Sequence, residues 1–266
     1  MNMLNTIIQK WVHTNMIKEI TSVNNTYIKE LLSLRDKQVR NNTNLFVVEG
    51  YHLVEEALKH HVLKVALCTD KEVLEKLNVD EKYLVSEQVI KKLSSTKTPQ
   101  NIIGVVNSIT NQDLESIISK NKLRLVILDN VNDPGNLGTI IRTSAALGID
   151  AVISSLETVD YYNDKVLRAT QGAIFKIPLF KMNLNEVLPL LKDNNIIVYG
   201  THLESSISIK EVEKKDKLAI VVGNEAKGVS KEVLDLCDRN VILPMDNDVE
   251  SLNVSIAAAL LMWELK

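Results

Sequence analysis

Residues 123–142 read LRLVILDNVNDPGNLGTIIR, and this stretch decides the fold class. It opens with an apolar run, 123–128, that lacks the polar alternation of a strand with one face in water. A loop rich in turn-forming residues follows, and an apolar segment with helical spacing, 138–147, completes the unit. A strand buried on both faces and followed by a helix predicts one β-α unit of a parallel sheet.

The same alternation continues to the end of the chain. The β-branched runs predict further strands at 151–154, 196–201, 218–222 and 240–243. Segments with helical spacing lie between and after them, at 162–170, 184–192, 230–236 and 252–265. We therefore predict that residues 122–266 form an α/β domain, with a parallel sheet covered by helices on both faces.

The residues before 109 have shorter elements and predict a separate, smaller α/β domain over 20–108. Apolar spacing favours one amphipathic helix over residues 25–40. Four strands and three further helices are predicted after it, with strands at 45–48, 62–67, 82–85 and 102–108 and helices at 51–59, 71–77 and 87–93. The polar stretch 109–121 is interpreted as a linker, and residues 1–19 as an N-terminal extension.

Composition excludes several classes of protein. The chain has 266 residues, 45% of them hydrophobic and 24% charged, which is typical of globular proteins rather than of disordered or fibrous ones. A net charge of −3 does not suggest a protein that coats nucleic acid or membranes. Cys68 and Cys237 are far apart, so no disulfide framework or CxxC zinc site is expected, and the default location is a reducing cytoplasm. The apolar run 256–263 is far shorter than the roughly 20 residues that span a bilayer.

Three loops after predicted strands carry unusual polar side chains, at 129–138, 223–228 and 243–255. Ligands of open α/β sheets bind beyond the carboxyl ends of strands, which makes these loops candidate sites. Arg142 lies early in the helix predicted after the first loop, where a cation is favourable only with an anion nearby. Helix capping and turn formation are the alternative interpretation of each loop. Neither GxGxxG nor GxxxxGK[ST] occurs, so a dinucleotide site or a P-loop has no support.

Together the three loops resemble the SpoU, or TrmH-like, branch of the SPOUT RNA methyltransferases. The motifs that carry the resemblance are NLGTIIRTSA from residue 136, GNEAKG from residue 223, LPM from residue 243 and ESLNVS from residue 250. The segment FVVEG, 46–50, resembles the ribosomal-protein-like RNA-binding domain of that family. Asn247 departs from the usual glycine of the third motif, although asparagine also tolerates the left-handed region.

The resemblance implies a fold and an activity. It implies a deep trefoil knot in the C-terminal domain, which topology rules alone would exclude. It also implies transfer of a methyl group from S-adenosylmethionine to a ribose 2′-hydroxyl in RNA, by a homodimer without a metal. We expect 23S ribosomal RNA as the target, with tRNA as the alternative substrate. A noncatalytic RNA-binding assembly factor is a second hypothesis, and a small-molecule enzyme that uses another nucleotide is a third with little support.

The resemblance also assigns roles to residues by motif position. Arg142 would be the general base or its electrostatic equivalent. Four polar residues would orient the reacting groups: Asn136, Glu225, Ser251 and Asn253. The cofactor would be held at Gly223, Asn224, Leu243, Pro244 and Leu252. A basic run predicts contacts with RNA phosphates, or else a solvated helix face, through Arg35, Lys37 and Arg40. His60 and His61 are interpreted as a helix end, and Cys237 as a core residue.

Overall fold

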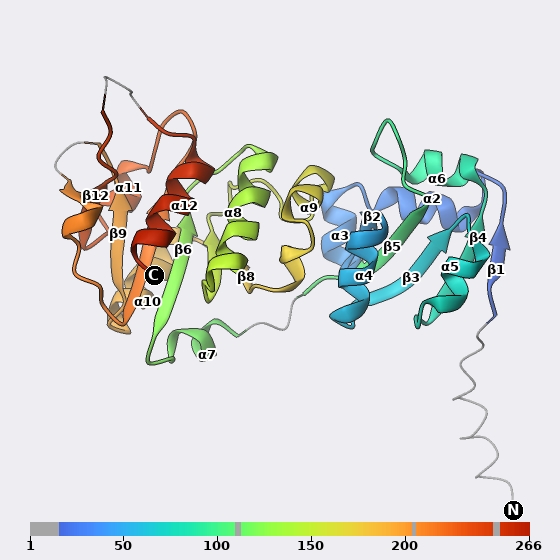
Figure 1. Ribbon diagram of the computed structural model, residues 1–266, viewed down its shortest axis with the longest axis horizontal. Coiled ribbons are helices and arrows are strands. Elements are labelled where there is room, and N and C mark those ends of the chain that lie inside the picture. The colour runs from blue at the N-terminus through green and yellow to red at the C-terminus, as the bar shows by residue number, and fades with distance from the viewer. Residues whose placement is uncertain (1–15, 110–112, 204–205, 247–250) are drawn as a thin grey trace, which may run out of the picture. The chain divides into compact units, whose positions relative to one another are not determined.

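The chain folds into two compact units, Met1–Ile109 (unit 1) and Thr110–Lys266 (unit 2), as the computed structural model shows (Figure 1). The structure describes residues 16–109, 113–203, 206–246 and 251–266. Residues 1–15 of the predicted extension, and the motif residues Asn247 and Glu250, lie outside this part of the chain. Within it, no helix is long and apolar enough to cross a membrane.

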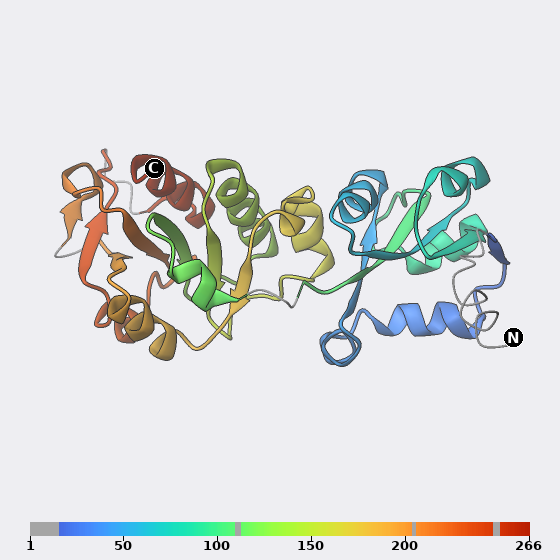
Figure 2. The same cartoon turned by 90° about the horizontal axis from the view of Figure 1, so that it is seen from below.

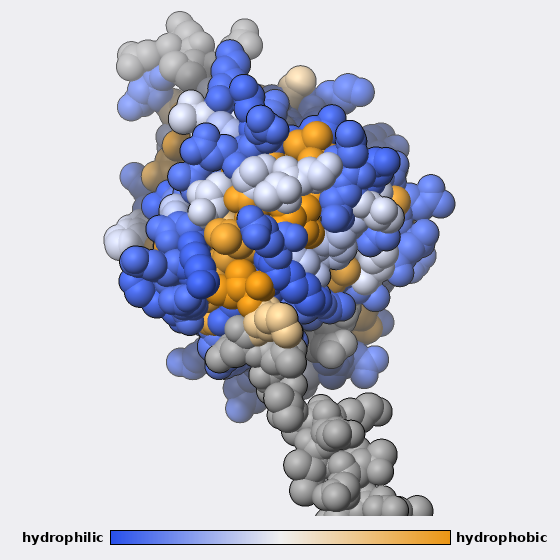
Figure 3. All heavy atoms as spheres, turned by 90° about the vertical axis from the view of Figure 1, so that its right-hand side faces the viewer, coloured by the Kyte–Doolittle hydropathy of each residue, from blue (hydrophilic) through white to orange (hydrophobic). Residues whose placement is uncertain are grey.

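Unit 1 contains a mixed five-stranded sheet in the order β1-β4-β3-β5-β2. Its strands are β1 (Lys18–Ile20), β2 (Leu45–Glu49), β3 (Leu63–Cys68), β4 (Glu81–Val85) and β5 (Ile102–Asn107). The pairs β1-β4 and β3-β4 are parallel, whereas β5 runs antiparallel to both of its neighbours, β2 and β3. The predicted extension ends at residue 19, but β1 starts at Lys18 and forms the sheet edge. Figure 3 looks onto this edge of unit 1 and shows a mainly hydrophilic surface with a broken strip of apolar side chains.

Helices cover both faces of the unit 1 sheet. The helices of this unit are α2 (Thr26–Ser33), α3 (Lys37–Thr43), α4 (Tyr51–Lys59), α5 (Lys71–Lys76) and α6 (Glu87–Leu93). Helices α2 and α6 share one apolar core with the sheet, in which Ile28 and Ile90 pack with Leu67. Helix α4 packs against β3 and β5, and helix α5 packs against β3 and β4. Figure 2 shows both helices across the sheet from α2 and α6.

The single helix predicted over residues 25–40 is two helices. Asp36 separates them, because its carboxylate accepts hydrogen bonds from the backbone N–H groups of Gln38 (2.7 Å) and Val39 (3.3 Å) and so caps α3. The apolar spacing of the two helices is nearly continuous across the break. Hydrophobic periodicity alone therefore did not reveal this cap.

Unit 2 contains a seven-stranded sheet in the order β10-β12-β9-β11-β6-β7-β8, and every pair in it is parallel. Its strands are β6 (Leu123–Leu128), β7 (Ala151–Ser154), β8 (Leu179–Lys181), β9 (Ile197–Thr201), β10 (Ile207–Ser208), β11 (Lys217–Val222) and β12 (Arg239–Ile242). The predicted parallel sheet is confirmed. The edge strands β8 and β10 were not predicted, because two or three residues are too few to show a pattern. The trefoil knot stays a prediction.

Helices lie on both faces of the unit 2 sheet, as predicted. They are α7 (Leu114–Ile118), α8 (Pro134–Leu147), α9 (Asp164–Thr170), α10 (Leu184–Asp193), α11 (Lys231–Leu234) and α12 (Val254–Glu264), with 3-10 turns η1 (Ala173–Phe175) and η2 (Ile209–Glu211). Figure 2 shows α8 and α12 on one face and α10 on the other. Leu125 and Ile127 of β6 pack into the core beneath α7, α10 and α11, and Val126 between them is also fully buried. Strand β6 is therefore buried on both faces.

Candidate functional site

Two loops of unit 2 lie side by side because β6 and β11 are adjacent parallel strands whose carboxyl ends meet at one edge of the sheet. The loop after β11 is closed on itself, since Asn224 and Gly228 exchange two backbone hydrogen bonds of 2.9 Å. The Asn224 side chain accepts hydrogen bonds from Ala226 N (3.0 Å) and Lys227 N (3.1 Å) and donates one to Asn130 O (2.9 Å). Asn224 therefore holds both loops in shape.

Gly223 begins the closed loop, and the backbone on the other side of the loop leaves no room for a side chain there. A Cβ at this position would lie 2.1 Å from the Gly228 carbonyl carbon and 2.2 Å from Val229 N. The close approach that this glycine allows is made by the backbone on the other side of the loop.

A chain of side-chain hydrogen bonds connects all three motif loops. Asn136 Nδ2 donates to Glu225 Oε1 (3.0 Å), and Asn253 Nδ2 donates to Asn136 Oδ1 (3.0 Å). Ser255 then donates to Asn253 Oδ1 through its hydroxyl (2.6 Å) and its backbone N–H (2.9 Å). A carboxylate can only accept hydrogen bonds, so Glu225 determines which way both asparagine amides point. We call Glu225, Asn136, Asn253 and Ser255 the site network.

Glu225 is the anionic end of this network. Its carboxylate also accepts hydrogen bonds from the backbone N–H groups of Asp133 (3.0 Å) and Asn132 (3.3 Å). Partial burial raises the pKa of Glu225, but the hydrogen bonds from Asn136 and from these backbone groups outweigh it, and the net pKa lies below its usual value. Glu225 is therefore a carboxylate at neutral pH and acts as an anchor for the first loop.

We expect Glu225 to make a contribution to stability that depends on pH. Because its pKa is lowered by folding, the contribution is present above the unfolded-state pKa of about 4.3 and is lost as the pH falls through the folded value. Urea unfolding of the wild type and Glu225→Gln should therefore give a difference in unfolding free energy that shrinks below about pH 4. Glu232→Gln, at an exposed glutamate of α11, is the control. A difference for Glu225→Gln that is constant with pH would contradict this role.

Arg142 projects from α8 and is exposed. Within the described ranges, its guanidinium makes no hydrogen bond or ion pair. The helix begins at Pro134, with Asp133 as its N-cap, and not at residue 138 as predicted. Arg142 consequently lies well past the first turn, and the argument that the helix dipole demands an anion beside it was wrong. The fold itself gives Arg142 no structural task.

Ser251 and Asn253 also differ from their predicted setting. The terminal helix begins at Val254 rather than at residue 252, so Ser251 and Leu252 precede it. Asn253 is the N-cap, because its side chain accepts the hydrogen bond from Ser255 N. Capping and membership of the site network are therefore properties of the same side chain.

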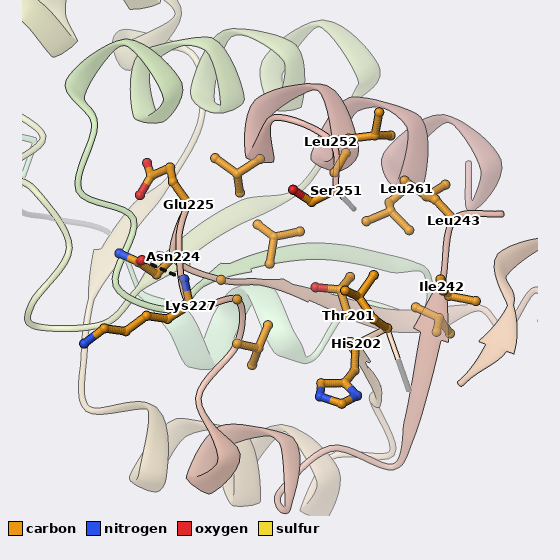
Figure 4. Close-up of a pocket in the computed structure, with 18 of the residues that line it drawn as sticks. Thr201, His202, Asn224, Glu225, Lys227, Ile242, Leu243, Ser251, Leu252 and Leu261 are labelled. Atoms are coloured by element: carbon orange, nitrogen blue, oxygen red, sulfur yellow. Dashed lines mark hydrogen bonds between the residues drawn. The ribbon is translucent and has the colours of Figure 1, made fainter. Parts of the chain in front are cut away.

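A cavity of about 500 Å³ opens beside these loops (Figure 4). Of the predicted cofactor residues, Gly223, Asn224, Leu243 and Leu252 line it, whereas Pro244 is exposed and does not. Two of the predicted orienting residues, Glu225 and Ser251, line it as well. Asn136, Asn253 and Arg142 are outside the lining, and the first two reach Glu225 through the site network.

Two polar residues of the cavity wall were missed in the sequence. Thr201 is the last residue of β9 and His202 follows it, and both lie across the cavity from Ser251 in Figure 4. They stand at the carboxyl end of a predicted strand, so the rule that indicated the other loops applied to them too. The Lys227 side chain extends away from the cavity in the same view.

The cavity fits an organic cofactor of moderate size. Its volume lies within the range of roughly 300–1,000 Å³ that is usual for small-molecule sites. Much of its wall is apolar, with polar groups at a few points; the apolar residues include Val222, Leu243, Leu252, Val254 and Leu261. No group of three or more metal-ligating side chains is found among the described residues.

The three predicted RNA contacts in unit 1 have different surroundings. Arg40 is only 8% exposed, and its guanidinium donates to the backbone carbonyls of Leu34 and Arg35, in the turn between α2 and α3. Arg35 is exposed and donates to carbonyl groups at the end of α6. Lys37 is exposed. Burial makes Arg40 a structural residue, which corrects its assignment to RNA. As predicted, His60 ends helix α4 and Cys237 packs against the core.

Comparison with known proteins gives matches over both units. A model of the SpoU rRNA methylase family matches residues 123–263, and a model of the MRM3-like substrate binding domain matches residues 25–104. The 23S rRNA (guanosine(2553)-2′-O)-methyltransferase RlmP of Bacillus subtilis is 38% identical over 253 residues, which cover 94% of this chain and all of that protein. An uncharacterised tRNA/rRNA methyltransferase of Synechocystis is 32% identical and covers 95% of both chains.

Solved structures are similar over the same length. The AdoMet-bound rRNA methyltransferase of Sinorhizobium meliloti superposes with a TM-score of 0.85 at 29% identity, and the match covers 94% of this chain and 97% of that one.

Proposed function

The chain belongs to the SpoU rRNA methylase family, and from this membership we propose that it methylates a ribose 2′-hydroxyl of 23S ribosomal RNA. As a member of that family it is an RNA methyltransferase, and its methyl donor is S-adenosylmethionine. The RNA target is the part that we propose. Its support is the similarity to RlmP along nearly the whole chain, including the substrate binding domain in unit 1.

The structural observation that supports methyl transfer at this site is the site network beside the cavity. Asn136, Glu225 and Asn253 come from three different motif loops, and hydrogen bonds of 3.0 Å join them. Structural capping alone would satisfy each loop separately. A single polarised network that connects them is what orientation of two reactants requires.

The reaction makes a specific demand on the residues of the chain. A ribose hydroxyl is a very weak acid, so a group must help to remove its proton during attack on the methyl group. Among the predicted catalytic residues, Glu225 has its carboxylate occupied by hydrogen-bond donors. Arg142 and Ser251 are exposed and make no side-chain hydrogen bond in the described part of the chain, and of the two only Arg142 carries a charge. We propose that Arg142 assists the deprotonation, directly or by stabilising the developing alkoxide.

The cavity would hold the methyl donor. When bound, S-adenosylmethionine supplies an electrophilic methyl group on a sulfonium ion whose charge disappears during transfer. The apolar wall at Leu243, Leu252 and Leu261 would exclude water from it, which favours a reaction that loses charge. Ser251 and Thr201 would provide hydrogen bonds to its polar parts.

Methyl transfer to RNA from a strain that lacks this gene tests the proposed function, because such RNA has vacant sites. The purified protein is incubated with labelled S-adenosylmethionine and total RNA, and the product is mapped by nuclease digestion. We expect label in one 2′-O-methylated nucleotide of 23S rRNA. Label confined to tRNA would overturn the proposed target, and cofactor binding without any label would favour an assembly factor.

We also propose that the protein is a homodimer and acts in the cytoplasm, where ribosomal RNA is found. The resemblance implies the dimer, and helix α12 supports it. Three large apolar side chains of α12 recur at helical spacing and are exposed: Ile256 (51%), Leu260 (44%) and Trp263 (63%). Such a face on one helix is typical of a protein interface. Sedimentation of the purified chain at several concentrations tests the proposal, and a monomer throughout would contradict it.

A further inference from the structure

The turn between α2 and α3 in unit 1 is held from inside the fold. The Arg40 side chain is 8% exposed, and its Nη1 donates to Leu34 O (2.9 Å) and Arg35 O (2.7 Å). These carbonyls belong to the turn that ends α2. Arg40 therefore fixes the backbone from which the exposed side chain of Arg35 projects.

Arg35 connects this turn to the end of α6. Its Nη2 lies 3.2, 3.3 and 3.0 Å from the carbonyl oxygens of Lys92, Leu93 and Ser94. Carbonyls in the last turn of a helix lack partners within the helix, and Arg35 supplies one. The contact places the turn at residues 34–37 beside the last turn of α6, which carries Lys91 and Lys92.

The loop after α6 is also held in a defined shape. The carboxylate of Glu49, at the end of β2, accepts hydrogen bonds from the hydroxyls of Ser94 (2.8 Å) and Thr96 (2.9 Å). It accepts two more from the backbone N–H groups of Ser95 (3.3 Å) and Gln100 (3.2 Å). All of the loop from 94 to 100 is thereby tied to the sheet, and it presents Lys97 to solvent.

Positive charge gathers where these segments meet, and the Glu49 carboxylate that holds the loop is occupied by four hydrogen bonds. Lys37, Lys91, Lys92 and Lys97 are exposed, and their ammonium groups make no hydrogen bond or ion pair with the residues that the structure describes. The sequence contains no Asp or Glu from residue 88 to 112. The acid of the adjoining turn, Asp36, is occupied in capping α3. Lys91 and Lys92 are not needed to satisfy the α6 carbonyls, because Arg35 already does so.

We propose that Arg35, Lys37, Lys91, Lys92 and Lys97, here called the basic surface, bind the phosphodiester backbone of the substrate RNA. This inference rests on the proposed function and names the contact surface on unit 1. Phosphate contacts position RNA without reading its sequence, and lysine serves as a point charge for them. A pre-formed loop loses less conformational entropy when it binds than a flexible one. The near-neutral composition of the unit does not reveal the surface, because it arises from two distant segments.

Salt dependence of RNA binding tests the basic surface. We would measure the affinity for an unmodified 23S rRNA transcript at several salt concentrations, for the wild type and a triple variant, Lys91→Ala, Lys92→Ala and Lys97→Ala. Each lost phosphate contact should reduce the slope of log K against log salt by roughly 0.7–0.9, so we expect a slope shallower by about 2. Affinity at low salt should fall at least about tenfold, while S-adenosylmethionine binding stays unchanged.

A second triple variant controls for overall charge. Lys64→Ala, Lys71→Ala and Lys76→Ala remove the same charge from exposed positions on β3 and α5, and should leave the slope unchanged. An unchanged slope in the first variant, or an equal change in both, would overturn the basic surface. Failure of the wild type to methylate any RNA would count against the proposed function instead. In that case the slope difference still decides whether this surface binds RNA.

Discussion

Arg142→Ala is expected to reduce methyl transfer by about 10²–10⁴-fold, the usual contribution of a group that assists proton transfer. The guanidinium is exposed and has no bonded partner in the described ranges, so its removal takes nothing from the fold. The melting temperature and the affinity for S-adenosylmethionine should therefore remain near those of the wild type. Single-turnover transfer at saturating RNA and cofactor, with a binding titration beside it, separates the two effects.

Two further variants make this test specific. Arg142→Lys keeps a positive charge but loses the planar array of donors, so partial recovery would indicate that the charge, and not the shape of the guanidinium, is what transfer requires. Lys231→Ala removes an exposed cation from α11 and should not affect transfer. Substantial residual activity in Arg142→Ala would exclude Arg142 from both roles.

Gly223→Ala is expected to have the second large effect, by opening the closed loop after β11. The new Cβ would overlap the backbone at Gly228 and Val229, at distances of 2.1–2.2 Å, and backbone atoms cannot rotate away as a side chain does. Overpacking of this kind usually costs about 1–3 kcal/mol of stability. The loop carries Asn224 and Glu225, so displacement should weaken cofactor binding at least about tenfold and break the site network. Calorimetric titration and urea unfolding measure the two effects.

Gly148→Ala is the matched control for this substitution. Gly148 follows α8 in the left-handed region, at φ +74°, and a Cβ there would meet nothing within 4 Å. The control should lose roughly 1–2 kcal/mol of stability through backbone strain and should bind the cofactor like the wild type. Equal loss of cofactor binding in both variants would mean that general destabilisation, and not the loop, explains the result.

The sequence was most informative where one strong local signal defined an element. The run 123–128 is predicted as a strand because six mostly apolar residues followed by a turn-rich loop are too short for a typical helix, and β6 has these bounds. The helix predicted at 138 starts at Pro134, because proline is well tolerated in a first helical turn. The site residues could be named from their motifs. Their hydrogen-bond directions could not, because these depend on Glu225 meeting Asn136 across 89 residues of sequence.

The same limit explains the basic run of unit 1. Arg35, Lys37 and Arg40 look equivalent in the sequence, since all three are cations on one amphipathic stretch. Packing separates them, because only Arg40 turns inward to the carbonyls that end α2. The contact of Arg35 with the end of α6, 57 residues away along the chain, is what brings three further exposed cations beside this run: Lys91, Lys92 and Lys97. Local patterns do not contain such information.

The site network also has a consequence for the order in which the protein is made. The hydrogen bond between Asn136 and Asn253 joins residues 117 positions apart. A ribosome that has synthesised the strand, loop and helix around Asn136 has therefore made only half of the contact. No partly synthesised chain that stops before α12 can assemble the network, whereas the sheet of unit 1 is complete once β5 has been made. If the basic surface binds RNA as proposed, nascent chains acquire the ability to hold RNA before the ability to modify it.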